Sequence, residues 1–262
     1  MQASLANSIP SDPHKNDHAD NMDRVGVAKS DPRERLIIAL DVSNAAAARK
    51  IVAAVGDSTL TYKVGMQLYT AVGPHLVREL VTSGRRVFLD LKYHDIPNTV
   101  AAAVREAAHL GVSMLTVHAA GGAKMLHAAV HAARNSNPAL KILAVTVLTS
   151  MDENDLEKIG VHGSVVEEVT RLAALALGNG CHGIVSSARE APALRKALGP
   201  GFDLVTPGVR PAGVTHGDQV RVVTPSEAIA AGASHIVVGR PITEALDPAA
   251  EARSILSQIS SS

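Results

Sequence analysis

Two lysines and an aspartate stand inside stretches of this sequence that are otherwise apolar. Lys63 lies in LTYKVGM, and Asp90 and Lys92 are separated by a single leucine in FLDLKYHD. Alternate side chains of an extended strand share a face, so Asp90 and Lys92 are expected to point the same way. A carboxylate and an ammonium held together in this manner can stabilise developing charge and transfer a proton.

The same residue types allow a structural interpretation. Opposite charges can be buried as ion pairs that do no chemistry, and one Asp–Lys pair could be of that kind. Further acidic residues follow the apolar runs, with Asp41 after LIIAL and Asp95 in the segment DIPNT. Because burying each charge costs several kcal/mol even after relaxation, the convergence of several aspartates and lysines favours a functional site.

Eight short apolar runs supply the framework that must position these side chains. Between them lie segments with helix-start signals: Asn44 before an alanine-rich run, Ser164 with Glu167, and Thr224 with Glu227. Strands that alternate with helices predict a parallel sheet. The expected strands cover residues 36–41, 60–66, 86–91, 114–118, 142–148, 183–187, 203–208 and 235–239.

The number of strands decides between two α/β architectures. Eight strands alternating with helices match a closed (β/α)₈ TIM barrel, a fold of about 250 residues. A doubly wound nucleotide-binding sheet would carry G-x-G-x-x-G after its first strand, whereas here that strand ends in Asp41-Val-Ser-Asn. We therefore predict a single barrel over residues 35–262, with the active site at the carboxyl ends of its strands.

Polar residues at the predicted strand ends are the candidates for that site. His118 is better explained as a structural histidine, and Ser186 is given no role. Arg210 follows the seventh strand and Arg240 the eighth, where barrels frequently bind phosphate, so together they predict a phosphate site. The strand-end candidates are Asp41, Lys63, Asp90, Lys92, His118, Thr149, Ser186 and Arg240.

The composition argues against several other classes of protein. With 25 Lys+Arg against 25 Asp+Glu the chain is not a generally basic nucleic-acid-binding protein, and five aromatic residues are too few for base stacking. One cysteine, Cys181, excludes an internal disulfide and suits a reducing cytoplasm. No apolar run approaches the length of about 18 residues that a membrane span needs.

Residues 1–34 differ from the rest of the chain. They contain scattered charges and prolines but no apolar run, so they lack the core of a signal peptide, and their acidity argues against a transit peptide. We predict a disordered extension. His14 and His18 within it are expected to be solvated.

The order of the motifs resembles a known family. Between residues 36 and 245 the chain contains, in order, ALDVS, YKVGMQLY, FLDLKYHDIPNTV, TVHAAGG, AVTVLTSM, TPGVRP, GDQ and VVGRPI. The run D-x-K-x-x-D-I-P-N-T is highly specific. Together these blocks resemble the orotidine 5′-phosphate decarboxylases, most of all their bacterial branch.

The resemblance implies a TIM-barrel enzyme that converts orotidine 5′-phosphate to UMP and CO₂ in de novo pyrimidine biosynthesis, with no metal ion or cofactor. Lys63, Asp90, Lys92 and Asp95 would form the family's alternating charge array. Lys92 would donate a proton to C6, and Asp90 would lie next to the departing carboxylate. Asp95 and Thr99 would reach into the neighbouring subunit's site, so the active form would be a homodimer.

The resemblance also implies substrate-binding roles. Asp41 and Lys63 would hold ribose hydroxyls, and Thr149 would contact the pyrimidine. A polar, glycine-containing segment, residues 212–220, is expected to close over the site as a lid. The phosphate would be bound by Arg210, Gln219, Gly239 and Arg240.

Three other functions stay open at this point. Related barrels, the 3-keto-gulonate 6-phosphate decarboxylases and hexulose-phosphate synthases, share D-x-K-x-x-D but use Mg²⁺, held partly by a Glu where this chain has Lys63. An aldolase could form a Schiff base on Lys63 or Lys92, which borohydride would trap with a carbonyl substrate. A sugar-phosphate-binding barrel would show affinity without turnover.

Overall fold

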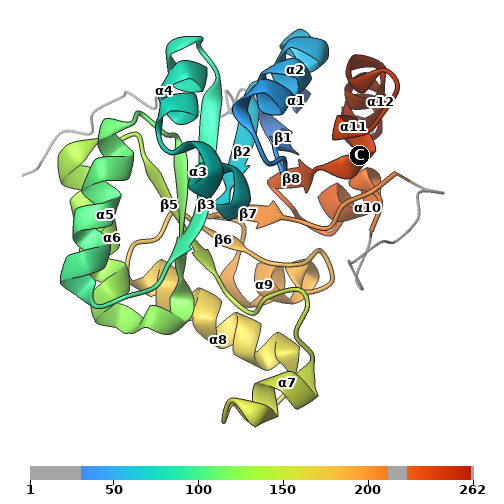
Figure 1. Ribbon diagram of the computed structural model, residues 1–262. Helices are drawn as coiled ribbons and strands as arrows, with labels where there is room; N and C mark the ends of the chain where they lie inside the picture. The colour runs from blue at the N-terminus through green and yellow to red at the C-terminus, as the bar shows by residue number, and fades with distance from the viewer. Residues whose placement is uncertain (1–30, 212–222, 261–262) are drawn as a thin grey trace, which may run out of the picture. The chain divides into compact units, whose positions relative to one another are not determined.

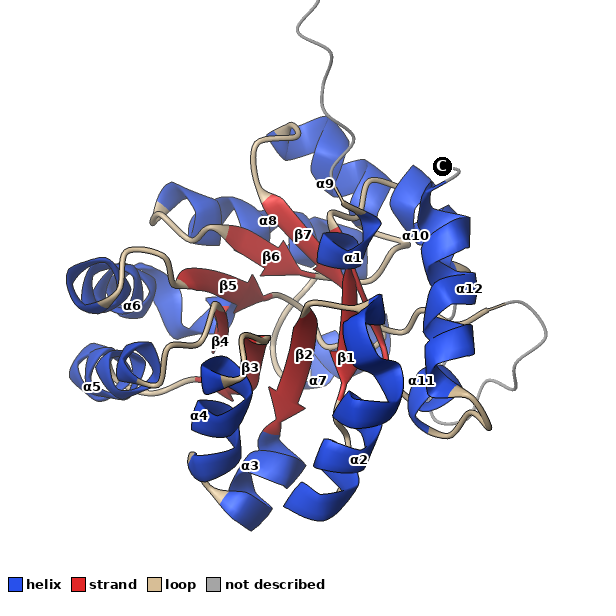
Figure 2. Cartoon of the chain, turned by 90° about the horizontal axis from the view of Figure 1, so that it is seen from above, coloured by secondary structure: helices blue, strands red, loops and turns tan. Residues whose placement is uncertain are grey.

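The computed structural model describes residues 31–211 and 223–260, and its strands close into a barrel. Parallel strands pair in sequence order, β8 returns to β1, and helices surround them (Figure 1; seen from above in Figure 2). This confirms the predicted (β/α)₈ TIM barrel. The strands are β1 (Leu36–Ala39), β2 (Thr61–Gly65), β3 (Arg86–Tyr93), β4 (Met114–His118), β5 (Lys141–Val145), β6 (Gly183–Val185), β7 (Asp203–Thr206) and β8 (His235–Val238).

Helices follow the strands in alternation. No helix of the described chain is long and apolar enough to cross a membrane. The α-helices are α1 (Pro32–Arg35), α2 (Ala45–Val55), α3 (Met66–Val72), α4 (His75–Thr82), α5 (Pro97–His109), α6 (Gly122–Ser136), α7 (Glu153–Lys158), α8 (Val165–Gly178), α9 (Ala191–Leu198), α10 (Pro225–Ala230), α11 (Arg240–Thr243) and α12 (Pro248–Ser260). The short 3₁₀ helices are η1 (Gly56–Ser58) and η2 (Ala119–Gly121).

The helix starts coincide with the predicted capping residues. Asn44 accepts a hydrogen bond from a backbone N–H at the start of α2. Ser164 and Glu167 form a capping box at α8, and Thr224 and Glu227 form another at α10. Each cap satisfies N–H groups that the first helical turn leaves unpaired, which fixes where the preceding loop ends.

Apolar side chains pack in two layers. The outer layer lies between the strands and the helices, and a smaller cluster fills the inside of the barrel. Side chains alternate between these layers along each strand. Phe88 belongs to the inner cluster, and Asp90 lies two residues further along β3. The alternation therefore places Asp90 on the inward-facing side of the strand as well. The inner cluster is Ile37, Ala39, Phe88, Met114, Leu143, Val205 and Val237.

Helix α1 begins inside the range that the sequence assigned to a disordered extension. Asp31 caps this helix, and Glu34 pairs with Arg86 at 3.1 Å. His235 Nδ1 lies 3.0 Å from the carbonyl oxygen of Glu34, and this contact connects α1 to β8. Residues 31–34 therefore belong to the barrel rather than to the extension, whose remaining part lies outside the described residues.

A cluster of charged side chains lies at the amino ends of the strands. Asp203 accepts a hydrogen bond from Lys141 Nζ at 2.7 Å and lies 3.7 Å from His235 Nε2. Burial raises the pKa of Asp203, but the attraction of His235 and the hydrogen bond and charge of Lys141 outweigh it and lower that pKa to about 2. The ionised carboxylate therefore stabilises the fold above the unfolded-state pKa of about 3.9, and this stability is lost as the pH falls towards 2.

We expect Asp203→Asn to lower the free energy of unfolding by about 2–3 kcal/mol at pH 7, the equivalent of that pKa difference. The deficit should shrink between about pH 4 and pH 2, where the wild-type carboxylate becomes protonated. Urea unfolding across this range measures both effects. Asp57→Asn is the control, because its ion pair with Arg85 is exposed. Equal losses in the two variants would contradict the prediction.

Candidate active site

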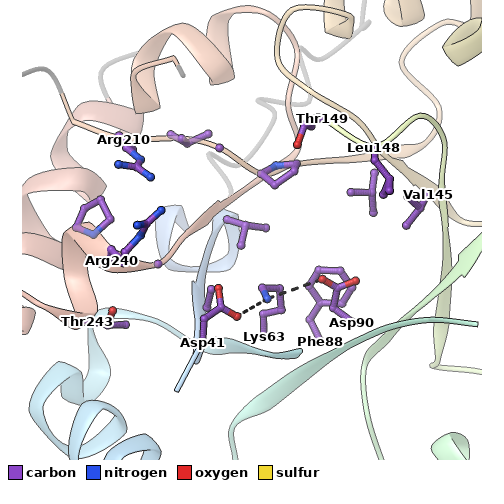
Figure 3. Close-up of a pocket in the computed structure, with 18 of the residues that line it drawn as sticks. Asp41, Lys63, Phe88, Asp90, Val145, Leu148, Thr149, Arg210, Arg240 and Thr243 are labelled. Atoms are coloured by element: carbon purple, nitrogen blue, oxygen red, sulfur yellow. Dashed lines mark hydrogen bonds and ion pairs between the residues drawn. The ribbon is translucent and has the colours of Figure 1, made fainter. Parts of the chain in front are cut away.

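A cavity of about 520 Å³ opens at the carboxyl ends of the strands (Figure 3). Its volume is in the range of about 300–1,000 Å³ that small-molecule sites occupy. The structure brings most of the predicted site residues into its lining: Asp41, Lys63, Asp90, Lys92, Thr149, Arg210, Gly239 and Arg240.

Four charged side chains from the ends of β1, β2 and β3 form an array of alternating sign. Lys63 Nζ lies 2.8 Å from Asp41 Oδ1 and 3.8 Å from Asp90 Oδ2, and Figure 3 shows it between the two carboxylates. Lys92 Nζ lies 2.9 Å from each carboxylate oxygen of Asp90. In the order Asp41, Lys63, Asp90, Lys92 each charge has a neighbour of opposite sign.

The inner members of this array are largely removed from water. The exposed fraction of the side chain is 12% for Lys63 and 14% for Asp90, against 58% for Asp41. Burying such charges costs several kcal/mol each, which the pairing offsets. Gly65 makes room for the ammonium, since a Cβ there would lie 3.1 Å from Lys63 Nζ. In these surroundings the charges act more strongly on a bound ligand than they would in water.

Strand β3 presents Asp90 and Lys92 through a bulge. From Leu89 to Tyr93 it advances four residues while its partner β4 advances two, so the register shifts. Lys92 has a φ of 51° and is the one residue other than glycine with a positive φ in the described chain. Both side chains reach the cavity, as the sequence predicted, but they do so from an irregular part of the strand rather than from regular alternation.

Two arginines line the cavity on the loops that follow the last strands. Arg210 comes after β7 and is 7% exposed, and Arg240 follows β8 at the start of α11. Figure 3 shows both on the same side of the cavity, away from Asp90. Gly208, with a φ of 76°, makes the turn that leads to Arg210. Paired guanidinium groups of this kind are suited to binding a phosphate through several hydrogen bonds.

The sequence matches known proteins over most of its length. Residues 34–255 match the family described as Orotidine 5′-phosphate decarboxylase / HUMPS family. A relative named orotidine 5′-phosphate decarboxylase, from Anaeromyxobacter sp. (strain K), is 54% identical over 224 residues, which is 86% of this chain and 97% of the relative. The chain belongs to the orotidine 5′-phosphate decarboxylase / HUMPS family.

Other members of the family support the same assignment. The orotidine 5′-phosphate decarboxylase of Moorella thermoacetica is 51% identical over 233 residues, which is 87% of this chain and 92% of the relative. The crystal structure of the enzyme from Lactobacillus acidophilus superposes with a TM-score of 0.78 at 38% identity, covering 86% of this chain and 99% of that one. The resemblance drawn from the sequence motifs is confirmed, and the chain is a carboxy-lyase.

Two described residues that the family resemblance assigned to the site are not among those that line the cavity. Asp95 and Thr99 are exposed, in the loop after β3 and in the first turn of α5. Asp95 Oδ1 accepts a hydrogen bond from Ile96 N at 2.6 Å. Gln219 lies outside the described residues, as does the lid expected over residues 212–220.

Sequence reasoning missed the apolar part of the cavity lining. Phe88 lies two residues before Asp90, and Val145 and Leu148 come from β5 and the loop after it. The strand alternation that indicated Asp90 could also have indicated Phe88, whereas Leu148 lies in a loop whose course the sequence does not specify. These side chains give a flat ligand an apolar surface beside the charges (Figure 3).

Two other residues considered in the sequence analysis, His118 and Cys181, do not line the cavity. His118 packs its ring 5.3 Å from that of His94, and burial lowers the pKa of His118, which suits a structural histidine. Burial raises the pKa of the Cys181 thiol to about 12, so it is a poor nucleophile. Within residues 31–211 and 223–260 no three His, Cys, Asp or Glu side chains gather in a group that could hold a metal ion.

Proposed function

We propose that the protein converts orotidine 5′-phosphate to UMP and CO₂ as a step of de novo pyrimidine biosynthesis. One observation carries the proposal: the Lys92 ammonium lies 2.9 Å from the Asp90 carboxylate in a cavity that also contains Arg210 and Arg240. A proton donor and phosphate-binding cations in one cavity are what this reaction needs. Relatives that share about half of their residues with this chain and are named orotidine 5′-phosphate decarboxylase support the proposal.

The chemistry explains why charge is concentrated at Lys92. Cleavage of the bond between C6 and the carboxylate leaves the electron pair on C6 in the plane of the ring, with no adjacent electron sink. Such a reaction needs its barrier lowered by on the order of 20 kcal/mol. The Lys92 ammonium stabilises the charge that develops at C6 and then donates a proton there, while Asp90 lies beside the departing carboxylate. No metal ion or cofactor enters these steps.

Binding of the rest of the substrate is assigned to the remaining polar residues. Asp41 and Lys63 hold ribose hydroxyls, and Thr149 contacts the pyrimidine. Binding energy from the phosphate, far from the bond that breaks, can be realised in the transition state, so the phosphate residues contribute to the rate as well as to affinity. The phosphate is bound by Arg210, Gln219, Gly239 and Arg240.

The active form in this proposal is a homodimer in the cytoplasm, in which Asp95 and Thr99 serve the site of the other subunit. Large apolar side chains near them support such an interface: Ile96 is 66% exposed after β3, and Met66 is 56% exposed after the neighbouring strand β2. Both residues follow the carboxyl ends of neighbouring strands, and large apolar side chains exposed at that end of the barrel favour a surface that a second subunit covers.

Purified protein should remove the ultraviolet absorbance of the orotate ring when it is mixed with orotidine 5′-phosphate, and treatment with EDTA should leave the rate unchanged. The absence of turnover in a well-folded dimer would overturn the proposed function. Activity that EDTA abolishes and Mg²⁺ restores would instead indicate the chemistry of the Mg²⁺-dependent barrels. Borohydride added with substrate should not inactivate the enzyme, since no Schiff base forms.

A further inference from the structure

Thr116, in the middle of β4, lies directly opposite the bulge of β3. Its neighbours Leu115 and Val117 pair with the two ends of the bulge, so Thr116 faces the extra residues. It is completely buried, and it lies two residues after Met114 of the inner cluster. It is not among the residues that line the cavity.

The Thr116 hydroxyl makes two hydrogen bonds to the charged pair. Its Oγ1 accepts a hydrogen bond from Lys92 N at 2.9 Å and donates one to Asp90 Oδ1, also at 2.9 Å. The same carboxylate oxygen also accepts a hydrogen bond from Lys92 Nζ. Because a hydroxyl offers one donor and two acceptor positions, both bonds form together. One side chain thus contacts both the backbone of Lys92 and the carboxylate that holds its ammonium.

The backbone of Lys92 needs such support. A positive φ is unfavourable for a residue with a Cβ and persists only where the surroundings fix it. The bulge also removes the Lys92 N–H from the regular ladder between β3 and β4. An N–H group left unpaired at this depth would destabilise the bulge, and the Thr116 hydroxyl supplies its partner.

We propose that Thr116 is a positioning residue of the decarboxylation: it fixes the bulge at Lys92 and the orientation of the Asp90 carboxylate, and it acts only through these two residues. The inference rests on the proposed function, because it takes the Lys92 ammonium to be the group that meets C6. Charges stabilise a transition state best when they are held in place before the reaction begins.

Two substitutions separate the hydroxyl from the rest of the side chain. Thr116→Val keeps the branched shape and removes the hydroxyl, whereas Thr116→Ser keeps the hydroxyl. We expect Thr116→Val to lower kcat about ten- to hundredfold, as for one lost hydrogen bond to a charged group. Its KM and its affinity for UMP should stay within about threefold, because the ribose and phosphate contacts remain. Thr116→Ser should keep kcat within about threefold of the wild type.

Thr206→Val is the matched control. Thr206 is also completely buried in a barrel strand, but its Oγ1 has no hydrogen-bond partner in the part of the chain that the structure describes. This variant should keep both kcat and the melting temperature.

The activity of the wild type, measured alongside the variants, distinguishes a failure of the proposed function from a failure of the proposed role of Thr116. If the wild type does not decarboxylate orotidine 5′-phosphate, the proposed function fails. If the wild type is active and Thr116→Val keeps its kcat, or Thr116→Ser is as slow as Thr116→Val, the role of the hydroxyl is overturned. If Thr116→Val does not fold, Thr116→Ala replaces it, because this variant also lacks the hydroxyl. A kcat of Thr116→Ala equal to that of Thr116→Ser would overturn the inference.

Discussion

Lys92→Ala should lower kcat by about 10⁵-fold, since it removes both a general acid and a cation placed at the developing charge, effects of about 10²–10⁴ and 10²–10³ respectively. Among the residues that the structure describes, no second ammonium lies in the same position. Lys63 Nζ lies 2.8 Å from Asp41 but 3.8 Å from Asp90, so it is paired mainly with Asp41, at the other end of the array. The variant should still bind UMP, because the arginines and the ribose-binding residues are unchanged.

Single-turnover decay of the orotate absorbance measures the loss, and titration with UMP measures the retained affinity. Lys141→Ala is the matched control, because Lys141 is also a strand lysine paired with an aspartate, 2.7 Å from Asp203, but at the opposite end of the barrel. It should lower stability and keep kcat. A decrease of less than about tenfold in Lys92→Ala would mean that the proton reaches C6 from another group.

The sequence predicted those parts of the structure that depend on neighbouring residues. Strand positions follow from short apolar runs, and helix starts follow from caps such as Ser164 with Glu167, whose bonds join residues three apart. The Asp–x–Lys motif and the arginines after the last strands then indicated the cavity, because in a barrel every strand ends at the same mouth. Local patterns were sufficient for the fold and for most of the cavity's polar residues.

The features that the sequence did not predict depend on residues far apart in the chain. The bulge at Lys92 is held by Thr116 on the next strand, and nothing in the β3 sequence specifies that bond. The boundary of the N-terminal extension was misplaced for the same reason: residues 31–34 are held by contacts of Glu34 with Arg86 and His235. Alternation within one strand carries no information about such partners.

Asp95→Asn should lower kcat by about 10²–10³-fold, although Asp95 does not line the cavity of its own chain. The proposed reason is that Asp95 extends the charge array of the partner subunit beside Lys92. Asp247→Asn provides a matched control: Asp247 is also an exposed aspartate just before a helix that begins with proline, and it accepts a hydrogen bond from Ala250 N. An Asp95→Asn variant with wild-type kcat would contradict the shared site.

Mixing two inactive variants tests the sharing directly. In a hybrid dimer of Asp90→Asn and Asp95→Asn subunits one site carries both substitutions and the other carries neither. Random reassociation of equal amounts should therefore restore about a quarter of the wild-type sites. Asp90→Asn mixed with Lys92→Ala should restore nothing, because Asp90 and Lys92 are placed in the same half-site and no hybrid contains a complete one. If hybrid dimers form and the first mixture stays inactive, each site is built from one chain alone.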